Sequence, residues 1–301
     1  MCEDYYFGFL DYPKSISFDG GTICSVDEGT YAKGREWIEE HRNSDGFVYP
    51  PPIREIASDP DTLEKIREIP NTERPALLYR LPKSHKICLS HPTDRDIRKA
   101  DGAFLVHLLA YLFETRLQFH DWWFDNRVPL GPTKKIFTHQ VLEDFLDHSY
   151  CKWKKWKPEE RNLMTNLLFM FSRAPSYEWD WEHFIIEYMV FDGLYKLVCS
   201  LHGPGAKTHK ERFKFVCDKF GIKHDEPGID RIYKLRNDLF HEALWDKSSP
   251  GMTDPNSNAL YQADNLRRFN SRLIPTVLGY TNKYVSTAWW SMSSFPFGKR
   301  V

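Results

Sequence analysis

The chain has 301 residues, of which 41% are hydrophobic and 28% charged, so it can bury an ordinary core without disulfides or a structural metal. Its formal net charge of −1 excludes a protein that coats nucleic acid through excess Lys and Arg, although it is compatible with a local basic cleft. The six cysteines are scattered, without Cys-x-x-Cys or zinc-finger spacing, which suits a reducing compartment.

The N-terminus has neither the basic segment nor the apolar segment of a secretory signal. The longest apolar run, residues 104–113, is interrupted by His107 and is too short to span a bilayer. We therefore expect a cytoplasmic protein that does not enter the membrane.

Residues 1–95 predict a small mixed α/β region. Short strands are expected at 5–10, 15–18, 22–24, 76–81 and 86–89, and helices at 30–41, capped by Thr30, and at 61–69. A polyproline segment, residues 50–52, breaks any element between them. This region is a candidate sensor for an unidentified ligand or inhibitor, which the sequence does not name.

Residues 96–301 predict an all-α domain, so the fold class is expected to be mainly α. Helices are expected at 97–119, 138–150, 158–173, 181–202, 208–220, 229–245 and 258–284. Gly221 is expected to end the fifth of these, and Pro275 to bend the last one. The tail after Ala288 is too aromatic to lie free in solvent and is expected to pack back onto the domain or onto a partner.

The helix expected at 229–245 carries Arg236, Asn237 and His241 beside an aliphatic face. These three residue types along one helix edge can hold and protonate a phosphodiester. Asn237 and His241 are neighbours at i, i+4. Arg236 and His241 are separated by roughly 140° around the axis and by about 7.5 Å along it. One helix alone is therefore expected to form an open site, which a second copy facing it would close.

This run resembles the Arg-x4–6-His motif of the HEPN superfamily in its Arg-Asn-x3-His form, and residues 233–241 look like part of the final core helices of the ApeA-like branch. The resemblance covers about residues 134–290. It includes Phe191-Asp192-Gly193-Leu194, because the family often carries an acidic residue near that position. Arg80 and His85 have similar spacing, but Pro82 between them argues against a helix there.

The resemblance implies a C-terminal HEPN-like helical bundle that works as an endoribonuclease, with RNA as substrate, a homodimeric site, no cofactor and no metal, and a role in toxin or antiviral systems. In this interpretation His241 transfers protons and Arg236 binds the scissile phosphate. Asn237 orients His241 or contacts a phosphate oxygen, and Asp192 holds Arg236 or His241. Because the sequence contains no convincing metal site, the expected nucleophile is the RNA 2′-hydroxyl. The alternative is an inactive helical dimerisation or RNA-binding module, in which these side chains form a buried polar network.

Two other patterns in the sequence each have a functional and a structural interpretation. Lys152, Trp153, Lys155 and Trp156 interleave basic and aromatic residues and predict contact with RNA; the alternative is a solvated helix end whose tryptophan rings face the core. His183 and Glu187 are four residues apart and could bind a metal, but without a third ligand a solvated pair is the favoured interpretation.

Overall fold

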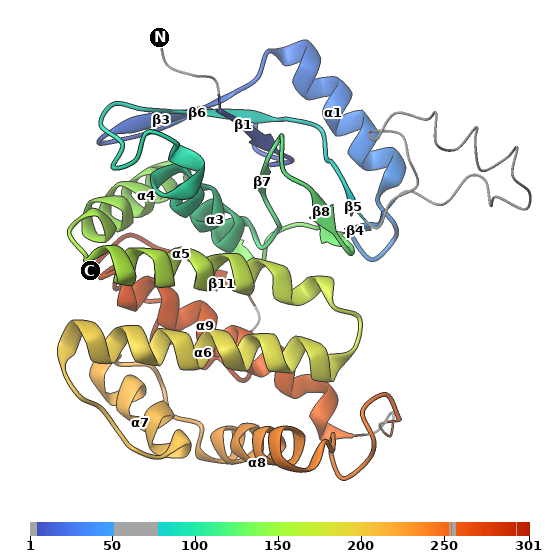
Figure 1. The fold of residues 1–301 in the computed structure, drawn as a ribbon, viewed down its shortest axis with the longest axis vertical. Helices are drawn as coiled ribbons and strands as arrows, with labels where there is room; N and C mark the ends of the chain where they lie inside the picture. Colours follow the sequence, from blue (N-terminus) through green and yellow to red (C-terminus); the bar gives the residue numbers. More distant parts are fainter. Residues whose placement is uncertain (1–4, 51–77, 253, 255–256, 293) are drawn as a thin grey trace, which may run out of the picture.

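The computed structural model describes residues 5–50, 78–252, 254, 257–292 and 294–301 of the chain. The helix expected at 61–69 and the first residues of the strand expected at 76–81 lie outside this part. What is described is mainly α-helical with a few small sheets, as the sequence predicts. Figure 1 shows the largest sheet and helix α1 at one end of the long axis, and helices α7 and α8 at the other end.

An antiparallel sheet of five strands has the order β2-β3-β6-β1-β7. The strands are β1 (Tyr5–Gly8), β2 (Ile16–Phe18), β3 (Gly21–Ser25), β6 (His85–Leu89) and β7 (Gln118–Phe119). In the central strand β6, Ile87 lies opposite Tyr5 on one side and Ile23 on the other. The turn from β2 to β3 passes through Gly20, whose φ of 101° is a conformation that favours glycine.

Two strand pairs join the expected N-terminal region to residues beyond it. They are β4 (Phe47–Val48) with β9 (Val128–Pro129), and β5 (Leu78–Tyr79) with β8 (Phe124–Asp125). Strand β7 also lies beyond residue 95, and the main hydrophobic core runs continuously from Phe7 on β1 through the helices to Phe297. The boundary expected at residue 95 therefore does not separate two cores.

Helix α1 (Glu28–His41) begins two residues earlier than expected. The Asp27 carboxylate accepts a hydrogen bond from the Thr30 N–H at 2.9 Å, so Asp27 is the N-cap and Thr30 lies inside the first turn. The expected capping role of Thr30 is thus wrong, because Asp27 caps the helix from three positions earlier and the Thr30 N–H is the donor that it satisfies.

The remaining helices form a stack in which α5 and α6 cross the middle of the molecule (Figure 1). Their bounds are α3 (Asp101–Phe113), α4 (His139–Lys154), α5 (Pro158–Arg173), α6 (Asp180–His202), α7 (His209–Phe220), α8 (Glu226–Glu242) and α9 (Gln262–Val277), with 3-10 turns η1 (Ile97–Lys99), η2 (Ala174–Ser176) and η3 (Asn258–Tyr261). The expected bounds of α5, α6 and α7 are confirmed to within one residue. No helix of the described residues is long and apolar enough to cross a bilayer.

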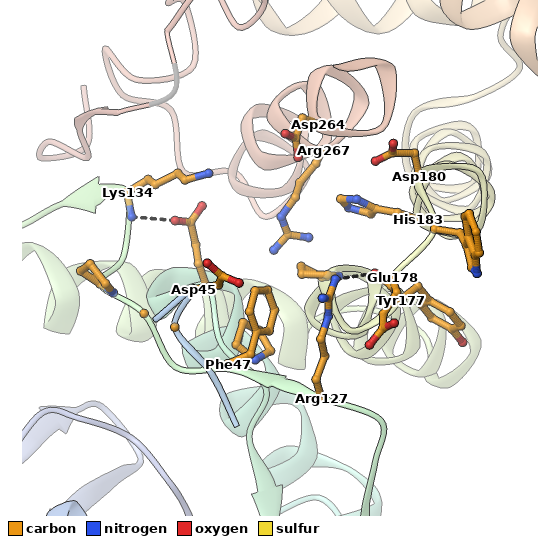
Figure 2. Close-up of a pocket in the computed structure, with 17 residues that line it drawn as sticks. Asp45, Phe47, Arg127, Lys134, Tyr177, Glu178, Asp180, His183, Asp264 and Arg267 are labelled. Atoms are coloured by element: carbon orange, nitrogen blue, oxygen red, sulfur yellow. Dashed lines mark hydrogen bonds between the residues drawn. The ribbon is translucent and has the colours of Figure 1, made fainter. Parts of the chain in front are cut away.

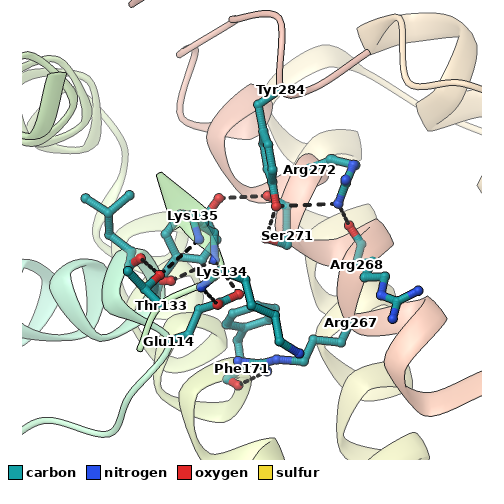
Figure 3. Close-up of polar contacts among 12 residues, drawn as sticks. Glu114, Thr133, Lys134, Lys135, Phe171, Arg267, Arg268, Ser271, Arg272 and Tyr284 are labelled. Carbon is teal, nitrogen blue, oxygen red and sulfur yellow. Dashed lines mark hydrogen bonds and ion pairs between the residues drawn. The ribbon is translucent and has the colours of Figure 1, made fainter. Parts of the chain in front are cut away.

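The tail returns to the helical core, as its aromatic composition predicts. Trp289 and Phe297 are buried, and β11 (Phe295–Pro296) pairs in parallel with β10 (Lys135–Ile136). Figure 3 shows Arg272 of α9 in contact with the Tyr284 hydroxyl, which precedes the tail in the sequence. The buried Arg272 of α9 donates to the Thr287 hydroxyl and to the Met292 carbonyl, each at 3.0 Å. The guanidinium therefore holds α9 and the tail together.

Candidate active site

Helix α8 presents one apolar face and one polar edge. Ile229, Ile232 and Leu235 are buried at the spacing of one helical face. Arg236 and Asn237 are half-buried beside this face, and His241 is exposed in the last turn. Ala243 ends the helix in a left-handed conformation with φ of 54°. Packing of the apolar face thus fixes the polar edge at the surface.

The Arg236 side chain closes the gap that the helix geometry leaves. Its Nη1 lies 2.9 Å from His241 Nε2 and 3.0 Å from Asn237 Oδ1. A guanidinium only donates, so His241 accepts at Nε2 and carries any neutral-state proton on Nδ1. Asn237 orients Arg236, and among the described residues it makes no hydrogen bond to His241, so that expected contact is not formed.

The Arg236 guanidinium is held between two aromatic rings. Its Cζ lies 5.9 Å from the ring centroid of Tyr188 on α6 and 5.1 Å from that of Phe240. Within the described residues, Nη2 has no hydrogen-bond partner. Arg236 therefore has a fixed position and spare donors, which is what a phosphate contact needs.

Asp192 takes a different partner from those expected. Its Oδ1 accepts a hydrogen bond from Arg212 Nη1 on α7 at 3.0 Å, and His209 Nδ1 lies 3.6 Å away. No hydrogen bond or ion pair in the described structure joins Asp192 to Arg236 or His241. The expectation that Asp192 contacts Arg236 or His241 is wrong, because Arg212 of α7 binds the Asp192 carboxylate instead.

His209, at the first position of α7, is a member of this polar group that the sequence did not predict. Its Nδ1 is 3.0 Å from the Tyr188 hydroxyl and 3.3 Å from Arg212 Nη1. Burial lowers the pKa of His209, the charges of Arg212, Arg236 and His241 lower it further, and Asp192 opposes them. The available signal was the capping box of Thr208 and Glu211, which fixes the helix start at His209.

Three helices thus contribute to one polar group, which we name the α6–α8 cluster. It consists of two hydrogen-bonded sets, which are Tyr188 and Asp192 from α6 with His209 and Arg212 from α7, and Arg236, Asn237 and His241 within α8. The two sets meet where Arg236 Cζ lies 5.9 Å from the centroid of the Tyr188 ring. The cluster combines two imidazoles with two guanidiniums and one carboxylate at a partly exposed surface. Such a set can bind an anion and transfer protons.

The tryptophans of the basic–aromatic run face the core. Trp153 is 1% exposed, its ring stacks on Phe104 at a centroid distance of 4.7 Å, and Trp156 is also buried. Base stacking by these rings is therefore wrong, and the alternative of a helix end with inward rings is confirmed. Lys152 and Lys155 are exposed, but Figure 1 shows α4 and α8 at opposite ends of the helical stack.

His183 and Glu187 do not form a solvated pair. Glu187 is fully buried and accepts from Arg267 Nη1 at 2.7 Å and from Asn270 Nδ2 at 2.8 Å, with His183 Nε2 at 3.5 Å. These donors occupy the carboxylate, so it is not free to bind a metal. Within the described residues, the group with metal-ligand spacing is Asp19, Asp147 and Cys151, near the β2–β3 turn and α4, away from the α6–α8 cluster.

A cavity of about 500 Å³ lies between the β4–β9 pair and the starts of α6 and α9. Figure 2 shows Asp180, His183, Asp264 and Arg267 turned toward one another on one side of it, with Arg127 on another. Burial raises the pKa of Asp180, His183 beside it opposes this increase, and the Asp264 charge adds to it. None of the cavity's lining residues belongs to the α6–α8 cluster.

Comparisons with family models, with curated proteins and with solved structures find no match to the chain. The resemblance to the HEPN superfamily therefore stays a prediction from the motif. Functional inference rests on the geometry of the α6–α8 cluster.

Proposed function

We propose that this chain is a metal-independent endoribonuclease, with Arg236, Asn237 and His241 in its active site. The observation that carries the proposal is the 2.9 Å contact between Arg236 Nη1 and His241 Nε2 at the edge of α8. A cation that binds phosphate and an imidazole that transfers protons are thereby joined at one accessible point. The Arg-Asn-x3-His resemblance points to the same residues.

In the proposed reaction the RNA 2′-hydroxyl oxygen attacks the adjacent phosphorus. Binding of the phosphate draws the Arg236 N–H away from His241, and the freed Nε2 takes the 2′-hydroxyl proton. The bond from phosphorus to the 5′-oxygen breaks, and an imidazolium protonates that oxygen. The products are a 2′,3′-cyclic phosphate and a 5′-hydroxyl, so neither a metal-bound hydroxide nor a water molecule is consumed.

We propose that the acid is His241 of the partner subunit in a two-fold dimer. Two exposed apolar side chains support an interface at this end. Phe240 is 47% exposed on α8, and Met189 is 50% exposed on α6, three residues before Asp192 and so on a neighbouring part of the helix surface. Burying both against a second copy would bring the two α8 edges together.

A role in a toxin or antiviral system belongs to the same proposal and rests on the HEPN resemblance alone. The second candidate is an inactive dimerisation or RNA-binding module. The 2.9 Å contact between Arg236 Nη1 and His241 Nε2 favours the enzyme, because it joins a phosphate-binding cation to a proton-transfer group.

The test is cleavage of plain single-stranded RNA in excess EDTA. We expect cyclic phosphate ends, and we expect a single 2′-deoxy substitution to block the cut at that position. Arg236→Ala and His241→Ala should each reduce cleavage by about 10²-fold or more, because each removes charge stabilisation or proton transfer. Circular dichroism should show an unchanged fold.

The matched controls are Arg231→Ala on the exposed side of α8 and His224→Ala in the preceding loop. Each substitution removes an arginine or a histidine outside the cluster, so both variants should cleave RNA at the rate of the unmodified chain. Equal cleavage of single-stranded DNA, loss of activity in EDTA, or full activity of a folded His241→Ala chain would refute the proposed mechanism. RNA binding without any cleavage would favour the inactive module.

A further inference from the structure

The α6–α8 cluster contains a second imidazole, His209, in the same subunit as His241. The Tyr188 ring connects the two groups: its centroid lies 6.0 Å from that of His209, and Arg236 Cζ lies 5.9 Å from it. The His209 side chain is 26% exposed, so it is accessible at the same surface. The proposed function as stated above assigns it no role.

The contacts of His209 define where its proton lies. Arg212 Nη1, at 3.3 Å, can only donate, so Nδ1 of His209 accepts and carries no hydrogen. The Tyr188 hydroxyl, at 3.0 Å from the same nitrogen, then also acts as a donor. The proton is therefore on Nε2, which has no hydrogen-bond partner among the described residues.

The two imidazoles consequently hold opposite tautomers. His241 accepts at Nε2 from Arg236 and keeps its hydrogen on Nδ1, whereas His209 accepts at Nδ1 and presents an Nε2–H. A base needs a free lone pair, which His241 gains when Arg236 moves to the phosphate. A group that presents a fixed N–H instead stabilises negative charge that develops on an oxygen.

We propose that His209 is a second catalytic residue of this site, a neutral imidazole whose Nε2–H donates to a non-bridging oxygen of the scissile phosphate. This inference rests on the proposed ribonuclease function. The donor meets the charge that develops as the 2′-oxygen attacks, while Arg236 binds the same phosphate from α8. Each subunit then supplies a proton acceptor, a cation and a neutral donor.

The surroundings of His209 keep it neutral. Tyr188 and Asp192 face it from α6, Arg212 from its own helix, and Arg236 and His241 from α8. Among these groups Asp192 favours the imidazolium, and its Oδ1 is already bound to Arg212. His209 also begins α7, where the positive end of the helix opposes a positive charge and attracts phosphate. A neutral imidazole at a helix N-terminus is suited to polarising an oxygen.

Kinetics separate a neutral donor from a proton-transfer group. We expect His209→Ala to lower kcat/KM by about 10²-fold and His209→Gln, whose amide N–H lies near the position of Nε2, to recover most of that loss. Both variants should keep every ionisation of the pH–rate profile, whereas His241→Ala should lose both the base and the acid ionisation, because each subunit of the dimer loses its imidazole. The matched control is His224→Ala, outside the cluster.

An equal loss in His209→Ala and His209→Gln, accompanied by the disappearance of one ionisation, would overturn the proposal and make His209 a proton-transfer group. Unchanged kinetics in folded His209→Ala would also overturn it.

Nitrogen-15 NMR of the imidazoles gives a readout that does not depend on cleavage, so it decides the proposal even if the proposed nuclease activity fails. We expect an unprotonated Nδ1 and a protonated Nε2 for His209, assigned from the signal missing in His209→Gln. The titration midpoint should lie below the ordinary value for histidine. The probe is a fully 2′-deoxy version of the RNA oligonucleotide, which should shift the Nε2 signal. An imidazolium at neutral pH, or an Nε2 signal that does not respond at saturating probe, would refute the phosphate contact.

Discussion

At the scale of residues, the motif pointed to the α8 members of the α6–α8 cluster but not to the α6 and α7 residues beside them. Arg236, Asn237 and His241 share one helix, and their proximity follows from spacing and from the reach of an arginine. The partner of Asp192 depends on how α7 packs against α6, and no spacing within α6 contains that information. For the same reason His209 was missed, because its relation to His241 is purely tertiary.

The burial of Trp153 gives a residue-scale prediction. Trp153→Ala should lower the free energy of unfolding by about 3–5 kcal/mol, because it removes a large buried ring and leaves a cavity. RNA affinity of the folded fraction should not change. Lys155→Ala, on the exposed surface of the same segment, serves as the control and should leave stability within about 0.5 kcal/mol. Urea unfolding measures the free energy of unfolding, and filter binding measures the RNA affinity. Weaker RNA binding by a Trp153→Ala chain of normal stability would restore the stacking interpretation.

At the scale of elements, helix starts and ends were predictable where local chemistry sets them. Pro158 begins α5, and Gly221 ends α7 in a left-handed conformation, as expected. Helix α3 instead stops at Phe113, six residues before the predicted end. Glu114 is left-handed there, and its carboxylate accepts from the Lys134 N–H and from Lys135 Nζ. These donors lie about twenty residues further along the chain, at and just before β10, so the sequence around Glu114 gives no local signal for this helix end.

The ion pair at the end of α3 predicts a pH dependence (Figure 3). Burial acts to raise the pKa of Glu114, but the charges of Lys135 and Arg267 outweigh it and lower the pKa from 4.5 to about 2. Because the pKa of Glu114 is lower in the folded state than in the unfolded state, its charge stabilises the fold at pH values above the ordinary pKa of 4.5. This stabilisation is lost as the pH falls from 4.5 toward 2. Glu114→Gln should therefore cost about 3 kcal/mol at pH 7, since one pKa unit corresponds to about 1.4 kcal/mol.

Chemical unfolding between pH 7 and pH 2.5 measures this effect. The cost of Glu114→Gln should shrink as the pH is lowered through 4.5, because protonation progressively removes the same interaction from the unmodified chain. Glu36→Gln, an exposed carboxylate on α1, should leave stability nearly unchanged at every pH. A cost that is independent of pH would mean that Glu114 stabilises the fold by packing and not by its charge.

At the scale of the whole molecule, composition and periodicity gave the mainly α class correctly, but they did not indicate that strands before residue 95 pair with strands after it. Strands β7, β8 and β9 pair with the N-terminal strands β1, β5 and β4, respectively. Pairing between strands that are far apart in the sequence cannot be predicted from the residues of either strand alone. Figure 1 shows this sheet at the opposite end of the molecule from α8. A ligand sensed there would have to act on the cluster through the intervening helices.

The proposed dimer is the prediction that concerns the whole molecule. The Arg236–His241 contact already forms within one chain, so the dimer is needed to supply the acid and not to close the gap between these two residues. Light scattering at micromolar concentration should give twice the chain mass of 35.6 kDa. Met189→Lys should yield monomers, because it places an unpaired charge in the buried interface.

The matched control is Ile136→Lys, which adds the same charge at an exposed apolar residue on β10, outside α6–α8, and should remain dimeric. If the partner's His241 is the acid, the Met189→Lys monomer should lose cleavage although its own α6–α8 cluster is intact. Mixing inactive His241→Ala with inactive Arg236→Ala chains should not restore a full site, because each two-fold mixed dimer lacks one imidazole. A strictly monomeric chain that cleaves RNA at the full rate would leave His241 without its proposed acid partner and contradict the dimeric mechanism.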